Sequence, residues 1–350
     1  MSHRWPVVLL LLLCARVEAN HVRNRPVLRR TNHKLAGEVL DYTHNHGEDN
    51  RIWSPALCEK RDLYVYLPPC YDPHRAYPLV LWLHGVAEDE VSFLRDVIKP
   101  LDQAMACGLL PPMIIAAPDG SLHGFACFFS IGSFFNNTKA GNFEDFLMHD
   151  VWGFLHENYR ILPEREAHVI AGVSMGGGSA YGKAFKYRDR FKVIVGIFPP
   201  LNTRWESDRG RYRDNFDPAI FHIREDFSRG KEVVARFAGI PVRLRQITRP
   251  LYGKDPDMAI HIAADNPLEL MLGHDIQPCE FAMYIAYGGR DQFNIDAQVE
   301  SFLYNAKQRG IFPHVEYDPK GKHDRKTALS FVPSLLDWLA VEMARYKTAP

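Results

Sequence analysis

Two chemistries overlap in the segment AGVSMGGGSAYGKAF, which spans residues 171–185. Its first half contains the pattern G-x-S-x-G centred on Ser174, which is typical of a sharp strand-to-helix turn that presents a nucleophilic serine. Its second half contains G-x-x-x-x-G-K, ending at Lys183, which is most of a phosphate-binding loop. The first pattern indicates a hydrolase, and the second indicates a nucleotide-binding protein.

The phosphate-binding interpretation lacks two features that its chemistry needs. A hydroxyl side chain should follow the lysine as a ligand of Mg²⁺, and this chain has Ala184 there. The helix of a phosphate-binding loop should also begin near the lysine. In this chain the strand is expected to end near Val173, which would place Lys183 roughly three turns inside the following helix. We therefore favour the serine turn, where Gly172 and Gly176 avoid the collisions that larger side chains would cause.

A nucleophilic serine needs a base, and the base needs a carboxylate to orient it. When a serine follows a strand in this way, the acid and then the histidine are expected later in the chain. Asp291 follows a predicted strand, and His323 lies in a loop between the last predicted strand and the last helix. The sequence therefore predicts a catalytic triad of Ser174, Asp291 and His323.

Other residues could fill the acid and base positions. Asp296 is the alternative acid, but it belongs to the first turn of a predicted helix, where a carboxylate interacts favourably with the helix dipole. His314 and His274 are alternative bases, at the start of a strand and at the end of a long insertion. Both positions are more typical of surface or core histidines.

An oxyanion formed during acyl transfer needs two backbone N–H donors. The residue after the nucleophile, Met175, should supply one of them. The loop after the predicted strand YPLVLWLHG should supply the other, and Val86 is the residue that we expect there.

The elements that must position these residues alternate between strand and helix. Apolar runs such as YPLVLWLHG and PPMIIAAPDG are typical of strands buried on both faces. The order predicts an α/β fold with a mostly parallel central sheet of eight or nine strands, helices on both faces and an antiparallel hairpin first. Residues 201–274 are far longer than a usual connection in such folds, so we interpret this cap segment as a cap or lid over the site.

Composition narrows the partners. The 350 residues include 42 Lys plus Arg and 42 Asp plus Glu, so no excess of charge favours nucleic acid or an acidic membrane surface. Basic residues between positions 23 and 34 are interpreted as a solvated arm. We expect a small-molecule or carbohydrate-linked ester as substrate and no cofactor.

The N-terminus has the pattern of a secretory signal peptide. A short basic start precedes the apolar run WPVVLLLLLC, and VEA ends in a small residue, so residues 1–19 are predicted to be removed and residues 20–350 to form one catalytic domain. This predicts a secreted or periplasmic protein without a membrane-spanning helix. A lipid anchor on Cys14 is less favoured, because the bulky Leu13 precedes it.

Five cysteines remain after residue 19, at positions 58, 70, 107, 127 and 279. Export permits disulfides, and this odd number could form one or two, but no C-x-x-C spacing indicates a zinc site. His44 and His46 could bind a metal with the nearby acids, although such a cluster is more typical of a solvated hairpin tip.

Taken together, these segments resemble the putative-esterase family of the α/β-hydrolase superfamily. The family includes feruloyl and acetyl-xylan esterases, S-formylglutathione hydrolase, enterochelin esterases and mycolyltransferases. The matching text runs in family order from residue 54 to about residue 340: SPALCEKRDLYVYLPPCYDP, YPLVLWLHG, GLLPPMIIAAPDGS, FFNNTKAGNFEDF, AGVSMGGGSA, NPLEL, YGGRDQF and GKHD. The resemblance implies an α/β-hydrolase fold, the same triad and cofactor-free hydrolysis of a carboxylic ester.

The chain departs from the family pattern at two positions. Cys70 stands where the family usually has glycine, which suggests a disulfide or a buried thiol. Arg325 stands where many members have an aromatic residue. We expect an exported serine esterase acting on carbohydrate-linked or aryl esters, with residues 123–137 as a candidate aromatic lining. The alternatives are an acyltransferase with a sugar acceptor and a non-catalytic surface-binding protein on a hydrolase scaffold.

Overall fold

The computed structural model describes residues 25–124, 132–237 and 240–347. The predicted signal peptide at residues 1–19 lies outside them. Among the described residues, no helix combines the length and the apolar character that a bilayer crossing requires.

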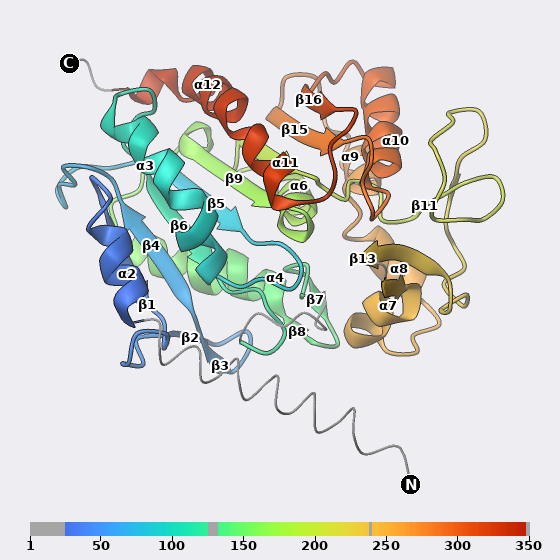
Figure 1. The fold of residues 1–350 in the computed structure, drawn as a ribbon, viewed down its shortest axis with the longest axis horizontal. Helices are drawn as coiled ribbons and strands as arrows, with labels where there is room; N and C mark the ends of the chain where they lie inside the picture. The colour runs from blue at the N-terminus through green and yellow to red at the C-terminus, as the bar shows by residue number, and fades with distance from the viewer. Residues whose placement is uncertain (1–24, 125–131, 238–239, 348–350) are drawn as a thin grey trace, which may run out of the picture.

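The core of the molecule is an eight-stranded sheet in the order β1-β4-β6-β5-β9-β10-β15-β16 (Figure 1). β4 pairs antiparallel with β1 and β6, and the other neighbouring pairs are parallel. The predicted mostly parallel sheet with an antiparallel start is therefore confirmed. The strands are β1 (Glu38–Tyr42), β4 (Leu63–Leu67), β5 (Leu79–Leu83), β6 (Ile114–Pro118), β9 (His168–Val173), β10 (Val193–Ile197), β15 (Ala282–Gly288) and β16 (His314–Asp318).

The central strands are buried on both faces because helices cover them. Every residue of β5, β6 and β10 is buried, as their continuous apolar sequences predict. The helices of this part are α2 (Arg25–Asn32), α3 (Ile98–Ala106), α4 (Phe143–Asp145), α5 (Trp152–Asn158), α6 (Met175–Lys186), α10 (Ile295–Gln308), α11 (Arg325–Ser330) and α12 (Val332–Glu342), with π-helical turns η1 (Phe93–Val97) and η2 (Phe146–Val151) and 3₁₀ turns η3 (Arg165–Ala167) and η4 (Ala344–Tyr346).

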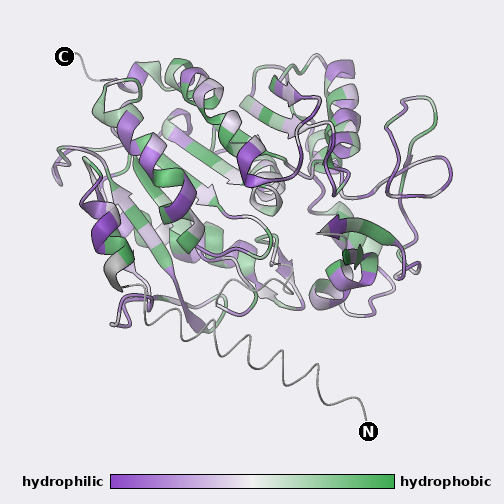
Figure 2. Ribbon diagram, viewed as in Figure 1, coloured by the Kyte–Doolittle hydropathy of each residue, from purple (hydrophilic) through white to green (hydrophobic). Residues whose placement is uncertain are grey.

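Short hairpins flank the sheet, and the cap segment carries its own elements. The hairpins are β2 (Ile52–Ser54) with β3 (Glu59–Arg61) and β7 (Asn137–Thr138) with β8 (Gly141–Asn142). The cap segment contains β11 (Trp205–Glu206), β12 (His222–Ile223), β13 (Val233–Phe237), β14 (Ile240–Arg243), α7 (Leu244–Tyr252), α8 (Met258–Ala263) and α9 (Pro267–Gly273). In Figure 1, β13, α7 and α8 form a separate group at the lower right, and Figure 2 shows apolar residues along β13.

Candidate active site

Ser174 occupies the turn between β9 and α6, as the sequence predicts. Its backbone has φ +54° and ψ −121°, a conformation that a non-glycine residue adopts at a cost in free energy. The Ser174 N–H donates a 2.7 Å hydrogen bond to the carbonyl of Ile197, at the end of β10. The turn is thereby fixed to the neighbouring strand, and the side chain is presented at the carboxyl edge of the sheet.

The two glycines around Ser174 are required by close backbone packing. A Cβ atom on Gly172 would lie 2.4 Å from the carbonyl carbon of Gly176. A Cβ atom on Gly176 would lie 2.1 Å from the carbonyl oxygen of Leu83, at the end of β5. Both contacts are shorter than any that side chains tolerate, so the predicted steric reason for these glycines is confirmed.

The three predicted triad residues are joined by hydrogen-bonding contacts. His323 Nε2 lies 2.9 Å from Ser174 Oγ, and His323 Nδ1 lies 2.7 Å from Asp291 Oδ2. The Asp291 side chain is fully buried, and its Oδ1 accepts a 2.7 Å hydrogen bond from the N–H of Phe293. With the proton on Nδ1, the ring leaves a lone pair on Nε2 for the serine hydroxyl.

Side chains that the sequence analysis did not select hold the His323 ring. The ring centroid lies 4.8 Å from that of Phe198 and 4.7 Å from that of Phe293. The His323 N–H donates a 2.9 Å hydrogen bond to Oε1 of Gln292. Gln292 and Phe293 directly follow Asp291, so their position next to the predicted acid could have identified them as neighbours of His323. Phe198 belongs to no motif that could have identified it.

The alternative acid and bases lie elsewhere. Asp296 is in the first turn of α10, where burial raises the pKa of its carboxyl group, and no hydrogen bond or ion pair joins it to His323 within the described part of the chain. The ring of His314 stacks on Tyr284 with centroids 5.3 Å apart, and His274 ends α9. The structure therefore joins Asp291 and His323 to Ser174, and none of the alternatives.

The two predicted oxyanion donors flank the serine. Met175 is the first residue of α6, so its N–H has no partner within the helix and lies at the positive end of the helix dipole. The loop before Val86 is also close, since a Cβ atom on Gly85 would lie 3.6 Å from Ser174 Cβ. Glu88, which the sequence analysis missed, fixes this loop by accepting a 3.0 Å hydrogen bond from the N–H of Gly85.

A cavity of about 860 Å³ opens beside Ser174 and His323. The α/β core contributes Val86, Met175 and Phe198 to its lining, and η1, α11 and α12 contribute further residues. The cap segment supplies the apolar side chains Val234, Ile240, Val242, Leu244, Ile247, Leu251 and Ile262. The long insertion therefore forms one wall of the cavity that holds the candidate triad.

Only part of the proposed aromatic lining at residues 123–137 is found at the cavity. Phe134 lines the cavity, whereas Phe135 is fully buried in the core. Residues 125–131 lie outside the described part of the chain.

Lys183, the lysine of the alternative phosphate-binding pattern, is buried and makes ionic contacts inside the protein. Its side chain is 1% exposed, and its ammonium group is hydrogen-bonded to Glu144 and, at 2.8 Å, to Oδ1 of Asn136. Asp265 of the cap segment lies 3.6 Å away. Lys183 therefore belongs to a buried ionic network between α6, α4 and the cap segment.

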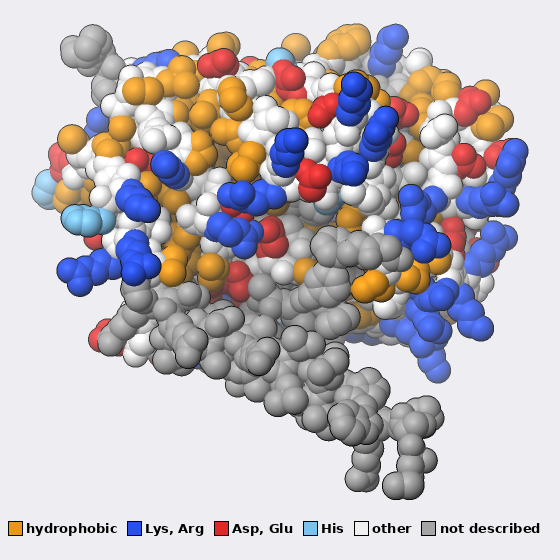
Figure 3. All heavy atoms as spheres, viewed as in Figure 1, with side chains coloured by type: hydrophobic (Ala, Val, Ile, Leu, Met, Phe, Trp, Pro, Cys, Tyr) orange, Lys and Arg blue, Asp and Glu red, His pale blue; other side chains and the backbone are white. Residues whose placement is uncertain are grey.

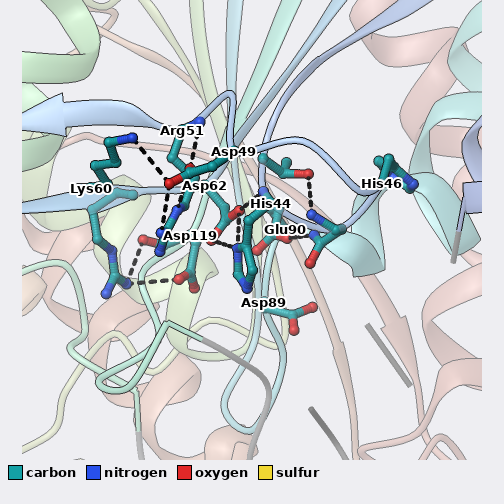
Figure 4. Close-up of polar contacts among 12 residues, drawn as sticks. His44, His46, Asp49, Arg51, Lys60, Asp62, Asp89, Glu90 and Asp119 are labelled. Carbon is teal, nitrogen blue, oxygen red and sulfur yellow. Dashed lines mark hydrogen bonds and ion pairs between the residues drawn. The ribbon is translucent and has the colours of Figure 1, made fainter. Parts of the chain in front are cut away.

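The histidine pair considered as a metal site does not converge. His44 Nδ1 lies 2.9 Å from Asp62, and this hydrogen bond raises the pKa of His44. His46 Nε2 lies 2.7 Å from the hydroxyl of Tyr64, and Figure 4 shows His46 well apart from His44. Within the described ranges, no group of three or more His, Cys, Asp and Glu side chains is arranged to hold a metal ion.

The interpretation of Cys70 as a disulfide or buried thiol is wrong. Cys70 is free and exposed, as are Cys58, Cys107 and Cys279, while Cys127 lies outside the described residues. The backbone of Cys70 has φ +55°, which explains why glycine is favoured at this turn. The other departure, Arg325, lines the cavity and forms a 2.6 Å ion pair with Asp96 of η1.

Comparisons with known proteins identify the family of this chain. A family model described as putative esterase matches residues 54–328. Among curated proteins, Esterase Rv1288 of Mycobacterium tuberculosis is 30% identical over 193 residues, which cover 53% of this chain and 40% of that protein. Endo-1,4-beta-xylanase Y of Acetivibrio thermocellus is 28% identical over 130 residues, 33% of this chain and 11% of that protein. This chain thus spans less than half the length of these curated relatives.

Solved structures share the fold. A ferulic acid esterase superposes with a TM-score of 0.61 at 17% identity, covering 89% of this chain and 99% of that one. An S-formylglutathione hydrolase from Agrobacterium tumefaciens superposes with a TM-score of 0.60 at 16% identity, covering 88% and 96%. With the family model matched over most of its length, this chain has the α/β-hydrolase fold and belongs to the putative esterase family.

Proposed function

We propose that this protein is a serine esterase that hydrolyses a carboxylic ester through Ser174, His323 and Asp291. The observation that carries the proposal is the unbroken chain of contacts from Ser174 Oγ to His323 at 2.9 Å and from His323 to the buried Asp291 at 2.7 Å. A serine hydroxyl becomes an effective nucleophile only when a base is so placed. Membership of an esterase family supports the same chemistry.

The reaction proceeds in two acyl-transfer steps. Ser174 Oγ attacks the carbonyl carbon of the ester while His323 Nε2 takes the hydroxyl proton, and Asp291 stabilises the imidazolium that results. The N–H groups of Met175 and Val86 donate hydrogen bonds to the tetrahedral oxyanion. His323 then gives its proton to the departing alkoxy oxygen, which leaves an acyl-enzyme and a free alcohol.

Water completes the cycle by the same route. His323 takes a proton from a water molecule as its oxygen attacks the acyl carbon, and it returns that proton to Ser174 Oγ as the bond to the acyl group breaks. The products are a carboxylic acid, an alcohol and the free enzyme. Because each proton is returned, the cycle needs only water as a second substrate.

The cavity supports an ester with a bulky apolar acyl or aryl group. Its volume of about 860 Å³ is at the upper end of what binding pockets provide, and the cap segment lines it with aliphatic side chains. The proposed substrates are therefore the aryl esters expected from the sequence and also esters of long acyl chains. A carbohydrate-linked alcohol rests on the family resemblance alone.

Export remains part of the proposal. The basic, apolar and small-residue pattern of residues 1–19 supports a cleaved signal peptide and a secreted or periplasmic location. We also propose that residues 20–350 act as one catalytic domain in which residues 201–274 serve as the cap.

The test is hydrolysis of p-nitrophenyl acetate and butyrate by the wild-type chain and by Ser174→Ala. We expect the substitution to lower kcat by more than roughly 1,000-fold while the folded state is retained. Ser228→Ala is the matched control, because this exposed serine does not line the cavity, and it should hydrolyse both esters at the wild-type rate. An unchanged rate for Ser174→Ala would refute the mechanism, and an acylated sugar formed in place of free acid would identify an acyltransferase.

A further inference from the structure

Helix α7 of the cap segment has two chemically different faces. Leu244, Ile247 and Leu251, at helical spacing, line the apolar cavity. Arg245 and Arg249 lie four residues apart and are exposed. A wall one helix thick therefore separates the acyl-binding cavity from a basic outer surface.

The basic surface extends beyond α7. Residues 227–254 contain seven Lys and Arg but a single acid, Glu232, although the whole chain has equal numbers of each charge. Glu232 forms an ion pair with Arg224, with 2.6 Å between Oε2 and Nη1. Figure 3 shows Lys and Arg side chains gathered at this end of the molecule, with hydrophobic side chains among them.

Four of these cations, Arg229, Lys231, Arg245 and Arg249, are exposed. Asp226 interacts electrostatically with Arg229, whereas Lys231, Arg245 and Arg249 form no ion pair with a carboxylate of the described residues. We name this set the basic cap face. Clustered cations that outnumber nearby carboxylates produce a positive potential that attracts an anionic partner.

Exposed apolar side chains accompany the basic cap face. Ile240 in β14 is 57% exposed and also lines the cavity, so the cavity reaches the surface on the same cap segment that carries these cations. Ile260 in α8 is 69% exposed. Large aliphatic side chains among cations are typical of proteins that rest on a lipid surface, where the cations meet anionic headgroups and the aliphatic groups meet the acyl region.

We propose that the basic cap face docks on a lipid surface rich in anionic headgroups and thereby places the cavity mouth against the acyl chains of an ester substrate. The substrate part of this inference rests on the proposed esterase function. An acidic polysaccharide would form ion pairs with the cations, but it would neither fill the apolar cavity nor make apolar contact with Ile240. The combination of cations and exposed apolar side chains on the cap segment therefore favours lipid.

The experiment measures sedimentation of the full chain with vesicles. One set contains phosphatidylcholine alone, and the other contains phosphatidylcholine with about one third phosphatidylglycerol. We expect binding to the anionic vesicles only, and we expect about 1 M NaCl to abolish it, because salt screens charges at a surface. The triple variant Lys231→Gln, Arg245→Gln and Arg249→Gln should bind roughly 100-fold more weakly.

The control is a second triple variant, Lys34→Gln, Lys307→Gln and Lys347→Gln. It removes the same charge from exposed lysines that lie outside the cap segment and form no ion pair with the described residues. It should bind like the wild type. Both variants should hydrolyse dissolved p-nitrophenyl butyrate at the wild-type rate, which separates this proposal from the esterase proposal.

Three outcomes would overturn the docking proposal. One is equal binding to neutral and anionic vesicles, and another is equal binding by the two triple variants. The third is absence of vesicle binding together with retention on immobilised polygalacturonate, which would assign the basic cap face to an acidic polysaccharide. Vesicle binding without esterase activity would leave the docking surface standing and refute the proposed hydrolysis.

Discussion

Asp291 and His323 follow two neighbouring parallel strands, β15 and β16, and their side chains meet at 2.7 Å. Because the carboxyl ends of parallel strands share one edge of the sheet, the pairing of β15 with β16 brings the acid and the base together. The same edge carries Ser174 at the end of β9. The order of the strands thus determines the geometry of the candidate triad.

Asp291→Asn should lower kcat for p-nitrophenyl butyrate by roughly 10,000-fold with little change in KM. The amide cannot stabilise the imidazolium, and its NH₂ group favours the wrong tautomer of His323, while the binding cavity stays as it is. Steady-state kinetics over a range of substrate concentrations measure both constants.

The matched control is Asp296→Asn, which makes the same change five residues along the chain in α10. This variant should keep kcat within a few-fold of the wild type, because the carboxylate hydrogen-bonded to His323 is that of Asp291. If the two variants lost activity equally, Asp291 would lose its assignment as the acid of the triad.

Ile247→Trp should shorten the preferred acyl chain. Ile247 lines the cavity from α7, and an indole ring there would fill space that a long chain needs. We expect kcat/KM for p-nitrophenyl laurate to fall by roughly tenfold or more, while the acetate ester is hydrolysed as before. Ile220→Trp, at a 44% exposed cap position outside the cavity lining, should leave the chain-length profile unchanged. A uniform loss across all chain lengths would contradict an acyl site at this wall.

The network around Lys183 should make stability depend on pH in the acid range. Burial opposes the charged form of Glu144, but the Lys183 and Lys186 ammonium groups outweigh it and hold the pKa of Glu144 at about 2, below its ordinary value of 4.5. A lowered carboxyl pKa stabilises the folded state above pH 4.5, and this contribution is lost as the pH falls toward 2. It amounts to on the order of 3 kcal/mol.

Denaturant unfolding at pH 7 and at pH 3 measures this effect. Glu144→Gln should be less stable than the wild type at pH 7, and its unfolding free energy should fall less between the two pH values. Lys183→Met should lose about 3 kcal/mol at pH 7, because it leaves Glu144 with one fewer cation in a buried site. The same pH dependence in the wild type and Glu144→Gln would show that the network makes no such contribution.

The sequence was sufficient to select the candidate triad because its members stand at recognisable places. Ser174 is fixed by glycines that only a tight turn requires, Asp291 follows the strongly apolar strand β15, and His323 follows the last predicted strand in a loop before the final helices. The environment of His323 was less predictable. Phe198 reaches the His323 ring because β10 lies between β9 and β15 in the sheet. This contact depends on the strand order, and no sequence pattern around residue 198 indicates it.

The cap segment was predictable as an insertion but not in its surface chemistry. Equal totals of acidic and basic residues suggested no anionic partner, yet the structure groups exposed cations at Lys231, Arg245 and Arg249. Average composition cannot reveal such grouping, because the acids that balance the total lie on other elements. The amphipathic spacing in α7 was the local signal that could have indicated it.

The strand order has a consequence for refolding. Ser174, Asp291 and His323 follow three different strands and become neighbours only after β10 and β16 have joined the sheet. Pairing between segments so distant in sequence closes long loops and is slow compared with local structure. Recovery of the proposed esterase activity should therefore trail the recovery of helical circular dichroism, so that regained ester hydrolysis would report the last folding step.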